Sequence, residues 1–208
     1  MGAIQSLFPT LIYQAPLQSK AVATRELNRQ LLREAMQFAE DDEAGQRWSD
    51  RNYPGGYTSY GSLCRLQTVS PTFARLGQLL GRHIKRYARE LALDLRAREL
   101  VMTDCWVNIM PAGVGHSLHL HPLSTVSGIY YVRTPPSSAA LKFEDPRLDR
   151  FMAAPPRRAD AAPALQPWRT VRPRAGECIL FESWLRHEVP VNQSRADRVS
   201  ISFNFNWF

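Results

Sequence analysis

Residues 198–208 read RVSISFNFNWF, and this closing stretch decides the fold. Apolar and polar residues alternate along it: Val199, Ile201, Phe203 and Phe205 are apolar, and Ser200, Ser202, Asn204 and Asn206 are polar. Because successive side chains of a β-strand point to opposite faces, the alternation predicts a strand with one buried face and one polar face.

Four earlier segments share the β-branched and aromatic composition that is typical of strands. They are LVMTDCWVNIM (100–110), TVSGIYYV (125–132), ALKFE (140–144) and CILF (178–181). Residues 147–174 are rich in proline, alanine and arginine, and they interrupt this series. We expect a long loop there, either a lid over a site or a disordered insertion.

The first half of the chain has helical periodicity instead. Apolar residues recur at helical spacing between residues 20 and 39 and again between residues 71 and 91, where Ser70 is a suitable N-cap and Pro71 a suitable first residue. Residues 41–63 collect Gly, Ser, Asp, Asn and Pro around three tyrosines, which predicts a loop. Helices followed by strands indicate an α+β fold whose sheet forms a sandwich or barrel.

Length and composition favour a single domain over residues 1–208, with 1–99 as helical support and 100–208 as the β-rich core. The net charge of +7 permits anionic partners, but without interleaved basic and aromatic residues we expect no nucleic-acid binding. Three widely separated cysteines, no leader pattern and no long apolar run predict a cytoplasmic protein without a membrane segment.

Three of the five histidines form a pattern that predicts a metal site. His119 and His121, two residues apart on an expected strand, would present both imidazoles on one side. His187, far downstream beside an apolar strand, would supply the third ligand of a facial triad, which leaves open positions for oxygen and substrate. His83 and His116 are interpreted as ordinary structural residues.

Arg198 follows His187 by eleven residues, a separation that lets an antiparallel strand return beside the first. A buried arginine there would bind a carboxylate bidentately and keep its charge. Ser200 faces the same way and would add a hydrogen bond.

The order of HLHP (119–122), SGIYYV (127–132), FEDPR (143–147), LFESWLRHEVPVN (180–192) and RVSISFN (198–204) resembles a family of small 2-oxoglutarate and iron(II)-dependent oxygenases, distantly similar to the prolyl hydroxylases. The resemblance covers residues 106–205 closely, and LFPTLIY (7–13) is similar to the opening of that family. It implies a double-stranded β-helix, the jelly-roll or cupin-like barrel, with N-terminal supporting helices.

For the site, the resemblance implies His119 and His187 as ligands, Arg198 on the distal carboxylate of 2-oxoglutarate, and Tyr131 on the same carboxylate. Ser200 and Asn108 are further candidates for co-substrate contacts. The implied activity is hydroxylation with O2, with succinate and CO2 as co-products, of a small molecule, peptide or protein that the sequence does not identify.

One residue departs from the common pattern of this superfamily, in which Asp stands where this chain has His121. An all-histidine triad lacks the negative charge of a carboxylate, which bears on the choice of metal. Glu182 or Asp145 would be the carboxylates available to join it, although neither has the spacing of a ligand.

Two alternatives to the 2-oxoglutarate oxygenase remain open at this point. The first is a three-histidine iron oxygenase that does not use 2-oxoglutarate, in which Arg198 and Tyr131 serve a substrate carboxylate. The second is a non-catalytic jelly-roll protein that binds a metal or a small anion, although such a protein has no need of Arg198.

Overall fold

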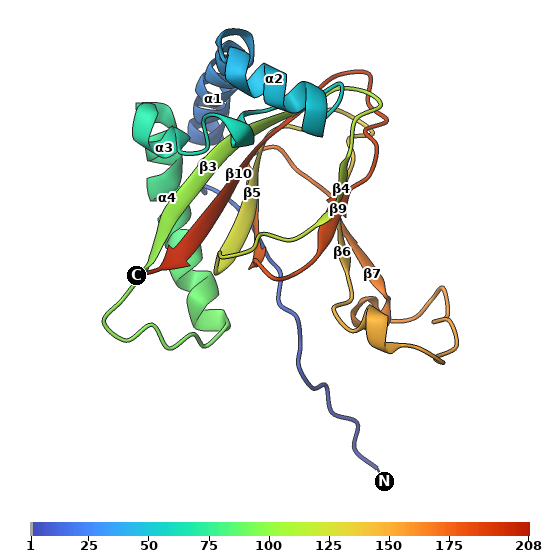
Figure 1. Ribbon diagram of the computed structural model, residues 1–208. Coiled ribbons are helices and arrows are strands. Elements are labelled where there is room, and N and C mark those ends of the chain that lie inside the picture. Colours follow the sequence, from blue (N-terminus) through green and yellow to red (C-terminus); the bar gives the residue numbers. More distant parts are fainter. Residues whose placement is uncertain (1) are drawn as a thin grey trace.

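The computed structural model of the protein describes residues 2–208 and consists of two antiparallel sheets with helices outside the larger one (Figure 1). The six-stranded sheet has the order β1 (Tyr13–Pro16), β8 (Glu177–Glu182), β5 (Val126–Arg133), β10 (Arg198–Trp207), β3 (Leu100–Met110) and β2 (Tyr57–Thr58). The four-stranded sheet has the order β4 (His116–His119), β9 (His187–Val189), β6 (Leu141–Glu144) and β7 (Trp168–Val171). The predicted α+β class is confirmed.

Strand β10 lies inside the larger sheet, between β5 and β3. Its alternation is confirmed: Ile201 and Phe203 are fully buried in the core beneath the helices, whereas Ser200 lines a cavity between the two sheets. The pairing of Ser200 with Asn108 on β3 and with Tyr131 on β5 puts three predicted site residues on neighbouring strands.

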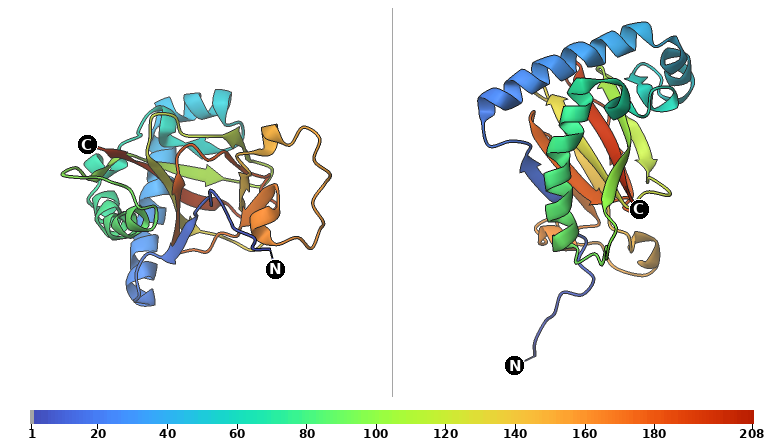
Figure 2. Two further views of the ribbon diagram at one scale, coloured as in Figure 1. Left: turned by 90° about the horizontal axis from the view of Figure 1, so that it is seen from below. Right: turned by 90° about the vertical axis from the view of Figure 1, so that its left-hand side faces the viewer.

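Two long helices, α1 (Ala21–Asp41) and α4 (Pro71–Glu90), cover the outer face of the larger sheet, as the right-hand view of Figure 2 shows. Both were predicted, as was the Ser70 cap, whose hydroxyl accepts from the backbone N–H groups of Thr72 and Phe73. Val22 lies within the apolar pattern predicted for residues 20–39 but is 70% exposed, because the buried stripe of α1 begins at Leu27. In residues 2–208, no helix has both the length and the apolar character needed to cross a bilayer.

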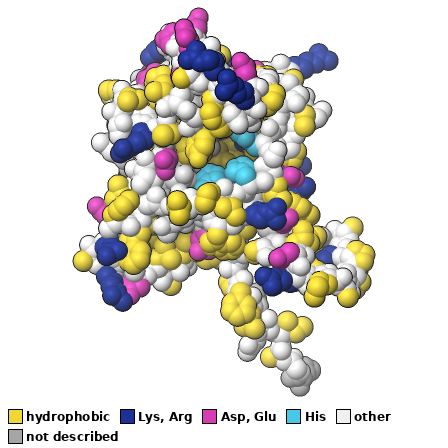
Figure 3. Space-filling view, viewed as in Figure 1, with side chains coloured by type: hydrophobic (Ala, Val, Ile, Leu, Met, Phe, Trp, Pro, Cys, Tyr) yellow, Lys and Arg dark blue, Asp and Glu magenta, His cyan; other side chains and the backbone are white. Residues whose placement is uncertain are grey.

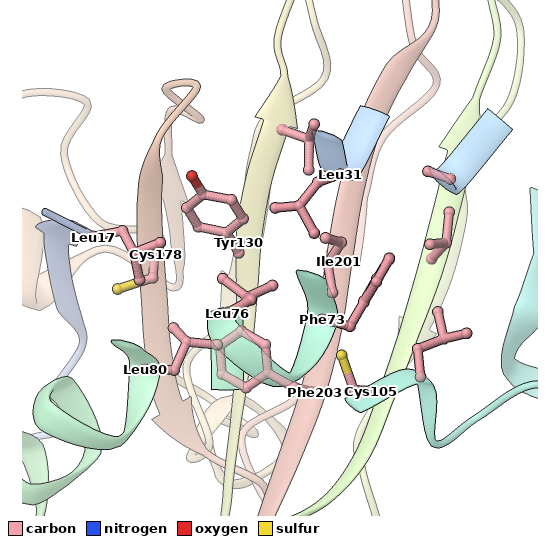
Figure 4. Packing of buried hydrophobic residues seen from close by; sticks show 14 of the residues in the cluster. Leu17, Leu31, Phe73, Leu76, Leu80, Cys105, Tyr130, Cys178, Ile201 and Phe203 are labelled. Carbon is pink, nitrogen blue, oxygen red and sulfur yellow. The ribbon is translucent and has the colours of Figure 1, made fainter. Parts of the chain in front are cut away.

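The main core lies between these helices and the larger sheet. Leucines of α1 and α4 meet Tyr130, Ile201 and Phe203 there, as Figure 4 shows in close-up. A second cluster, which includes Ile129, Tyr131 and Phe181, fills the space between the two sheets. Tyr130 and Tyr131 therefore face opposite ways, as adjacent strand residues must.

Two predicted loops contain regular structure. Residues 41–63 hold α2 (Glu43–Asn52) and a 3₁₀ turn, η1 (Ser59–Gly61), because Asp42 caps the helix by accepting from the N–H of Gly45. Residues 147–174 hold the short 3₁₀ turns η2 (Leu148–Arg150) and η3 (Pro163–Leu165) as well as β7, which pairs with β6. The edge strands β1 and β2 and the one-turn helix α3 (Leu66–Val69) are short elements that periodicity did not reveal.

The expected pairing of the His187 strand with the Arg198 strand is wrong. Strand β9 pairs with β4 and β6 in the smaller sheet, whereas β10 belongs to the larger one. The connection 190–197 crosses from one sheet to the other, so His187 and Arg198 approach each other across the space between the sheets and line one cavity.

Gly128 on β5 provides a test of the packing around β10. A Cβ at this position would lie 2.4 Å from Cε2 of Phe203 and 2.8 Å from the main-chain oxygen of Ile179. We expect Gly128→Ala to lower the free energy of unfolding by about 1–3 kcal/mol in chemical denaturation, as overpacking does. Gly81→Ala in α4 is the control: apart from its chain neighbours and the adjacent helix backbone, no described atom lies within 4 Å of the added Cβ, and the change should stabilise the helix by about 0.5–1 kcal/mol. Equal effects of the two changes would contradict this account.

Candidate metal centre

His119, His121 and His187 converge between the two sheets, and Figure 3 shows histidine side chains in a hollow that opens to the surface. His119 ends β4 and stands opposite His187 of β9 in the strand register. One potential ligand atom from each of His119, His121 and His187 lies within 4.8 Å of the other two. The structure thus brings together the three residues that the sequence predicted as ligands.

His121 reaches this position by a route that differs from the expected one. Strand β4 ends at His119, so the two residues do not share a strand. The backbone N–H of His121 instead donates to the carbonyl of Ser183 at 3.0 Å. The rings of His119 and His121 still lie nearly parallel, with their centroids 5.4 Å apart.

Each of the three imidazoles is fixed through its Nδ1 atom. Nδ1 of His119 lies 2.7 Å from the carbonyl of Ser117, and Nδ1 of His187 lies 2.9 Å from the carbonyl of Leu185. A carbonyl only accepts, so Nδ1 carries the proton in both rings and Nε2 keeps its lone pair. Nδ1 of His121 lies 2.7 Å from Oδ1 of Asn204, which also only accepts, and 2.9 Å from the hydroxyl of Ser127. Three Nε2 lone pairs are therefore available to one ion.

Burial keeps these imidazoles neutral, which is the form that binds metals. It lowers the pKa of His187 to about 3 and that of His121 to about 4. It also lowers the pKa of His119. At neutral pH no proton therefore needs to leave before a metal binds.

A polar network behind His121 was not predicted in this role. The hydroxyl of Ser127 lies 2.8 Å from both Asn204 Oδ1 and the hydroxyl of Ser183. The amide of Asn204 in turn faces Asp104 at 3.4 Å. The only sequence signal was the place of Asn204 on the polar face of the last strand, which does not say what it touches.

Arg198 lies deeper in the same space, next to the histidines. It is 1% exposed, and its Nη1 donates to the hydroxyl of Ser200 at 3.1 Å. Its Nε and Nη2 atoms, like the hydroxyl of Tyr131, are buried without a hydrogen-bond partner among the described residues. The guanidinium carbon lies 5.0 Å from the centre of the Tyr131 ring. Two unpaired donors on a buried cation fit an anionic ligand, since leaving them unpaired is costly.

The remaining candidates lie outside the triad. His116 stacks on Tyr53, with 4.2 Å between ring centroids, and lines the cavity without joining the triad. His83 lies elsewhere and bonds to Tyr13 and to the carbonyl of Leu17. Among the described residues neither Glu182 nor Asp145 belongs to the group that could hold a metal. Asp145 forms an ion pair with Arg147 instead.

Comparison with family models matches residues 104–204 to the family described as "Putative 2OG-Fe(II) oxygenase". This segment is just under half of the chain, and the match confirms the resemblance to the 2OG-Fe(II) oxygenases that the sequence predicted. A comparison with curated protein sequences gives no match.

Solved structures of low sequence identity share the fold. A prolyl-4-hydroxylase from Pseudomonas putida aligns with a TM-score of 0.61 and 17% identity over 95% of this chain and 92% of that one. The epimerase SnoN of nogalamycin biosynthesis aligns with a TM-score of 0.67 and 16% sequence identity, over 95% of this chain and 77% of that one. HygX from Streptomyces hygroscopicus was crystallised with nickel, 2-oxoglutarate and hygromycin B. It aligns with a TM-score of 0.62 and 16% sequence identity, over 95% of this chain and 83% of that one. The predicted jelly-roll architecture is confirmed.

Replacement of His187 tests the triad. We expect His187→Ala to lose stoichiometric binding of iron(II) or nickel(II), because two imidazoles remain where three converged, while the circular dichroism spectrum stays that of the folded protein. His83→Gln is the control and should keep full metal content, which elemental analysis measures. Full metal content and turnover in His187→Ala would show that this residue is not a ligand.

The pH dependence of metal binding tests the lowered pKa values. Imidazoles with the ordinary pKa of about 6.5 lose metal affinity steeply below that pH, since protons compete for the ligand atoms. With the pKa of His187 at about 3 and that of His121 at about 4, nickel(II) affinity should change little between about pH 7 and about pH 5. The measurement is a competition titration.

The same lowered pKa values preserve metal affinity at mildly acidic pH but make the stability of the metal-free fold depend on pH. The unfolded chain takes up protons on these histidines below about pH 6.5 while the folded chain does not, so the metal-free protein loses stability as the pH falls through that range. Circular dichroism therefore has to accompany the titration. A steep loss of affinity that begins at about pH 6.5 in folded protein would contradict the lowered pKa values.

Proposed function

We propose that this oxygenase uses iron(II) and 2-oxoglutarate to hydroxylate a substrate at the mouth of the barrel. One observation carries the proposal: three neutral imidazoles converge beside a buried arginine that has unpaired donors. The first arrangement suits a divalent metal and the second suits a carboxylate, and the family of the chain uses both kinds of ligand.

His119, His121 and His187 would hold the iron through their Nε2 atoms. Three nitrogen ligands on one side of an ion leave its other positions open, as in facial-triad iron enzymes. Because this ligand set carries no negative charge, the charge of the metal would be balanced by the co-substrate and not by the protein. HygX was crystallised with nickel and 2-oxoglutarate, which supports this pairing of ligands by analogy.

Arg198 would hold the distal carboxylate of 2-oxoglutarate. Its fork of N–H groups matches a carboxylate bidentately, and Nε and Nη2 are the atoms left without a partner within residues 2–208. The Tyr131 hydroxyl would donate a further hydrogen bond, and Ser200 steadies the guanidinium through Nη1. Asn108 stands on the wall beside them, with its amide donating to Ser202.

When bound, iron(II) and 2-oxoglutarate supply the oxidising power that places one oxygen atom of O2 in a substrate C–H bond, with succinate and CO2 as co-products. The chain itself contributes orientation and a dry environment. Its Nδ1 hydrogen bonds hold the three imidazoles in place, and Arg198 fixes the far end of the co-substrate. Phe181 packs against His187, at 4.6 Å between ring centroids, and keeps water from that side.

Arg198→Ala tests the co-substrate assignment. Loss of a charged partner from a buried carboxylate costs on the order of 2–5 kcal/mol. The concentration of 2-oxoglutarate needed for half-saturation should therefore rise by roughly tens to thousands of times. Metal content should hardly change, since the arginine is outside the triad. The measurement is an anaerobic titration of the visible charge-transfer band with iron(II) present.

Arg186→Ala is a matched control, because this arginine is half exposed and pairs with Glu144 on the surface. Its titration should match that of the unmodified protein. If the unmodified protein with a full iron site gives neither the band nor keto-acid-dependent oxygen uptake, 2-oxoglutarate is not the co-substrate. A three-histidine oxygenase that binds its substrate directly would then be the better description.

A further inference from the structure

A cavity of about 480 Å³ lies directly beside the three histidines and opens to solvent. Its walls come from α2, the segment 53–60, β3 and the region around β4, so the helical half and the β-rich half of the chain both contribute. His119 and His121 form part of its floor. A molecule seated there would meet the metal from the open side, so this cavity is the candidate substrate site.

The walls of this cavity contain no Asp, Glu, Lys or Arg among the described residues. In the space-filling view, hydrophobic side chains and histidines are prominent in the hollow (Figure 3). Its polar groups are neutral amides and hydroxyls, such as Asn52, Thr58 and Asn204. Burying a charged group without a partner is costly, so this wall selects against charged substrate groups.

Aromatic rings lead from the rim to the metal centre. Trp48 of α2 meets Tyr60 edge-on at 5.9 Å between centroids, and Tyr60 meets Trp106 of β3 at 5.1 Å. Trp106 in turn lies 5.7 Å from His121. Tyr60 is 52% exposed and Trp106 only 7% exposed, so the series runs inward from Tyr60 to the metal centre, and the partly buried Trp48 flanks Tyr60. Such rings offer faces and edges for stacking against a flat or cyclic group.

Asn108 provides a hydrogen-bond acceptor in the wall of the cavity near the histidines. Its Nδ2 donates to Ser202 at 3.0 Å, whereas its Oδ1 is buried and has no partner within residues 2–208. An unpaired acceptor repels carboxylate oxygens and suits an N–H or O–H group. Dianionic 2-oxoglutarate has no such donor, so a hydroxyl or amide of the substrate fits this atom better than the co-substrate does.

We infer that the substrate presents to this cavity an uncharged cyclic or aromatic group that carries a hydroxyl or amide donor. A cationic group would find no carboxylate in the wall, and an anionic group would find neither Lys nor Arg there. The neutral aromatic walls fit the remaining class. This inference rests on the proposed function, since it takes the histidine side of the cavity as the reacting end.

Three probes with one ring system and different charge test the inference. These are 2-naphthalenemethanol, 2-naphthoate and 2-naphthylmethylammonium, each measured by equilibrium dialysis against the protein with iron(II) and 2-oxoglutarate under nitrogen. The neutral alcohol should bind at least about tenfold more tightly than either charged probe. Equal affinities, or tighter binding of a charged probe, would overturn the inference.

Wall variants locate the binding. Trp48→Ala should weaken binding of the alcohol about fivefold, and the half-exposed Tyr60→Ala, which leaves the core intact, should act in the same direction. Trp207→Ala is the control, because Trp207 stacks with Arg98 at the chain end, outside the lining of the cavity. Asn52→Asp should bring the ammonium probe into the cavity. Unchanged affinities in all three wall variants would show that the probe binds elsewhere.

The acceptor on Asn108 is tested with the methyl ether of the alcohol, which has no O–H group. The ether should bind several-fold more weakly than the alcohol, and the difference should disappear in Asn108→Leu. A difference that persists in this variant would remove Asn108 from the inference.

The keto-acid charge-transfer band is recorded in the same samples. A normal band with failed probe selectivity would reject the substrate class alone, whereas a missing band would reject the co-substrate alone.

Discussion

The two-faced character of strand β10 is the constraint on which the rest of the structure depends. One face buries Ile201 and Phe203 under the helices, and the other carries Arg198 and Ser200 into the space between the sheets. A shift of the strand by a single residue would exchange the two faces, placing asparagine in the core and phenylalanine in the site. The hydrophobic core thus fixes the register, and the register fixes the position of the guanidinium relative to the histidines.

Without a ligand, the buried guanidinium of Arg198 lowers the stability of the folded protein. A buried charge with unmet donors costs stability, and natural proteins keep few such groups. Arg198 and Tyr131 concentrate three unpaired polar atoms in one place in the described chain. Buried polar atoms are left without hydrogen-bond partners mainly at functional sites, where a ligand completes the hydrogen bonds. Binding of an anionic ligand at this position would therefore add to the stability of the folded protein.

Much of this arrangement could be predicted from the sequence, and the exceptions have physical reasons. Periodicity identified α1, α4 and the long strands because their buried faces repeat over many residues. It missed α2, whose capping residue Asp42 was hidden in a composition typical of loops. The eleven-residue separation of His187 and Arg198 suggested that β9 pairs with β10, but spacing along the chain does not say which sheet a strand joins. The spacing of the histidines predicted the triad, and the family resemblance supported His119 and His187, whereas the place of Asn204 behind His121 depends on tertiary contacts.

The anchoring of the imidazoles divides the triad into two kinds of position. His119 and His187 are oriented by main-chain carbonyls, which every residue type provides, so drift at Ser117 or Leu185 leaves the anchoring atom in place. His121 is oriented by the side chain of Asn204, which a single nucleotide change can alter. Of the three imidazoles, His121 is therefore the one whose anchor a substitution can most readily change. A substitution at Asn204 would alter the orientation and the electron-donating strength of His121, while the carbonyls that orient His119 and His187 would stay in place.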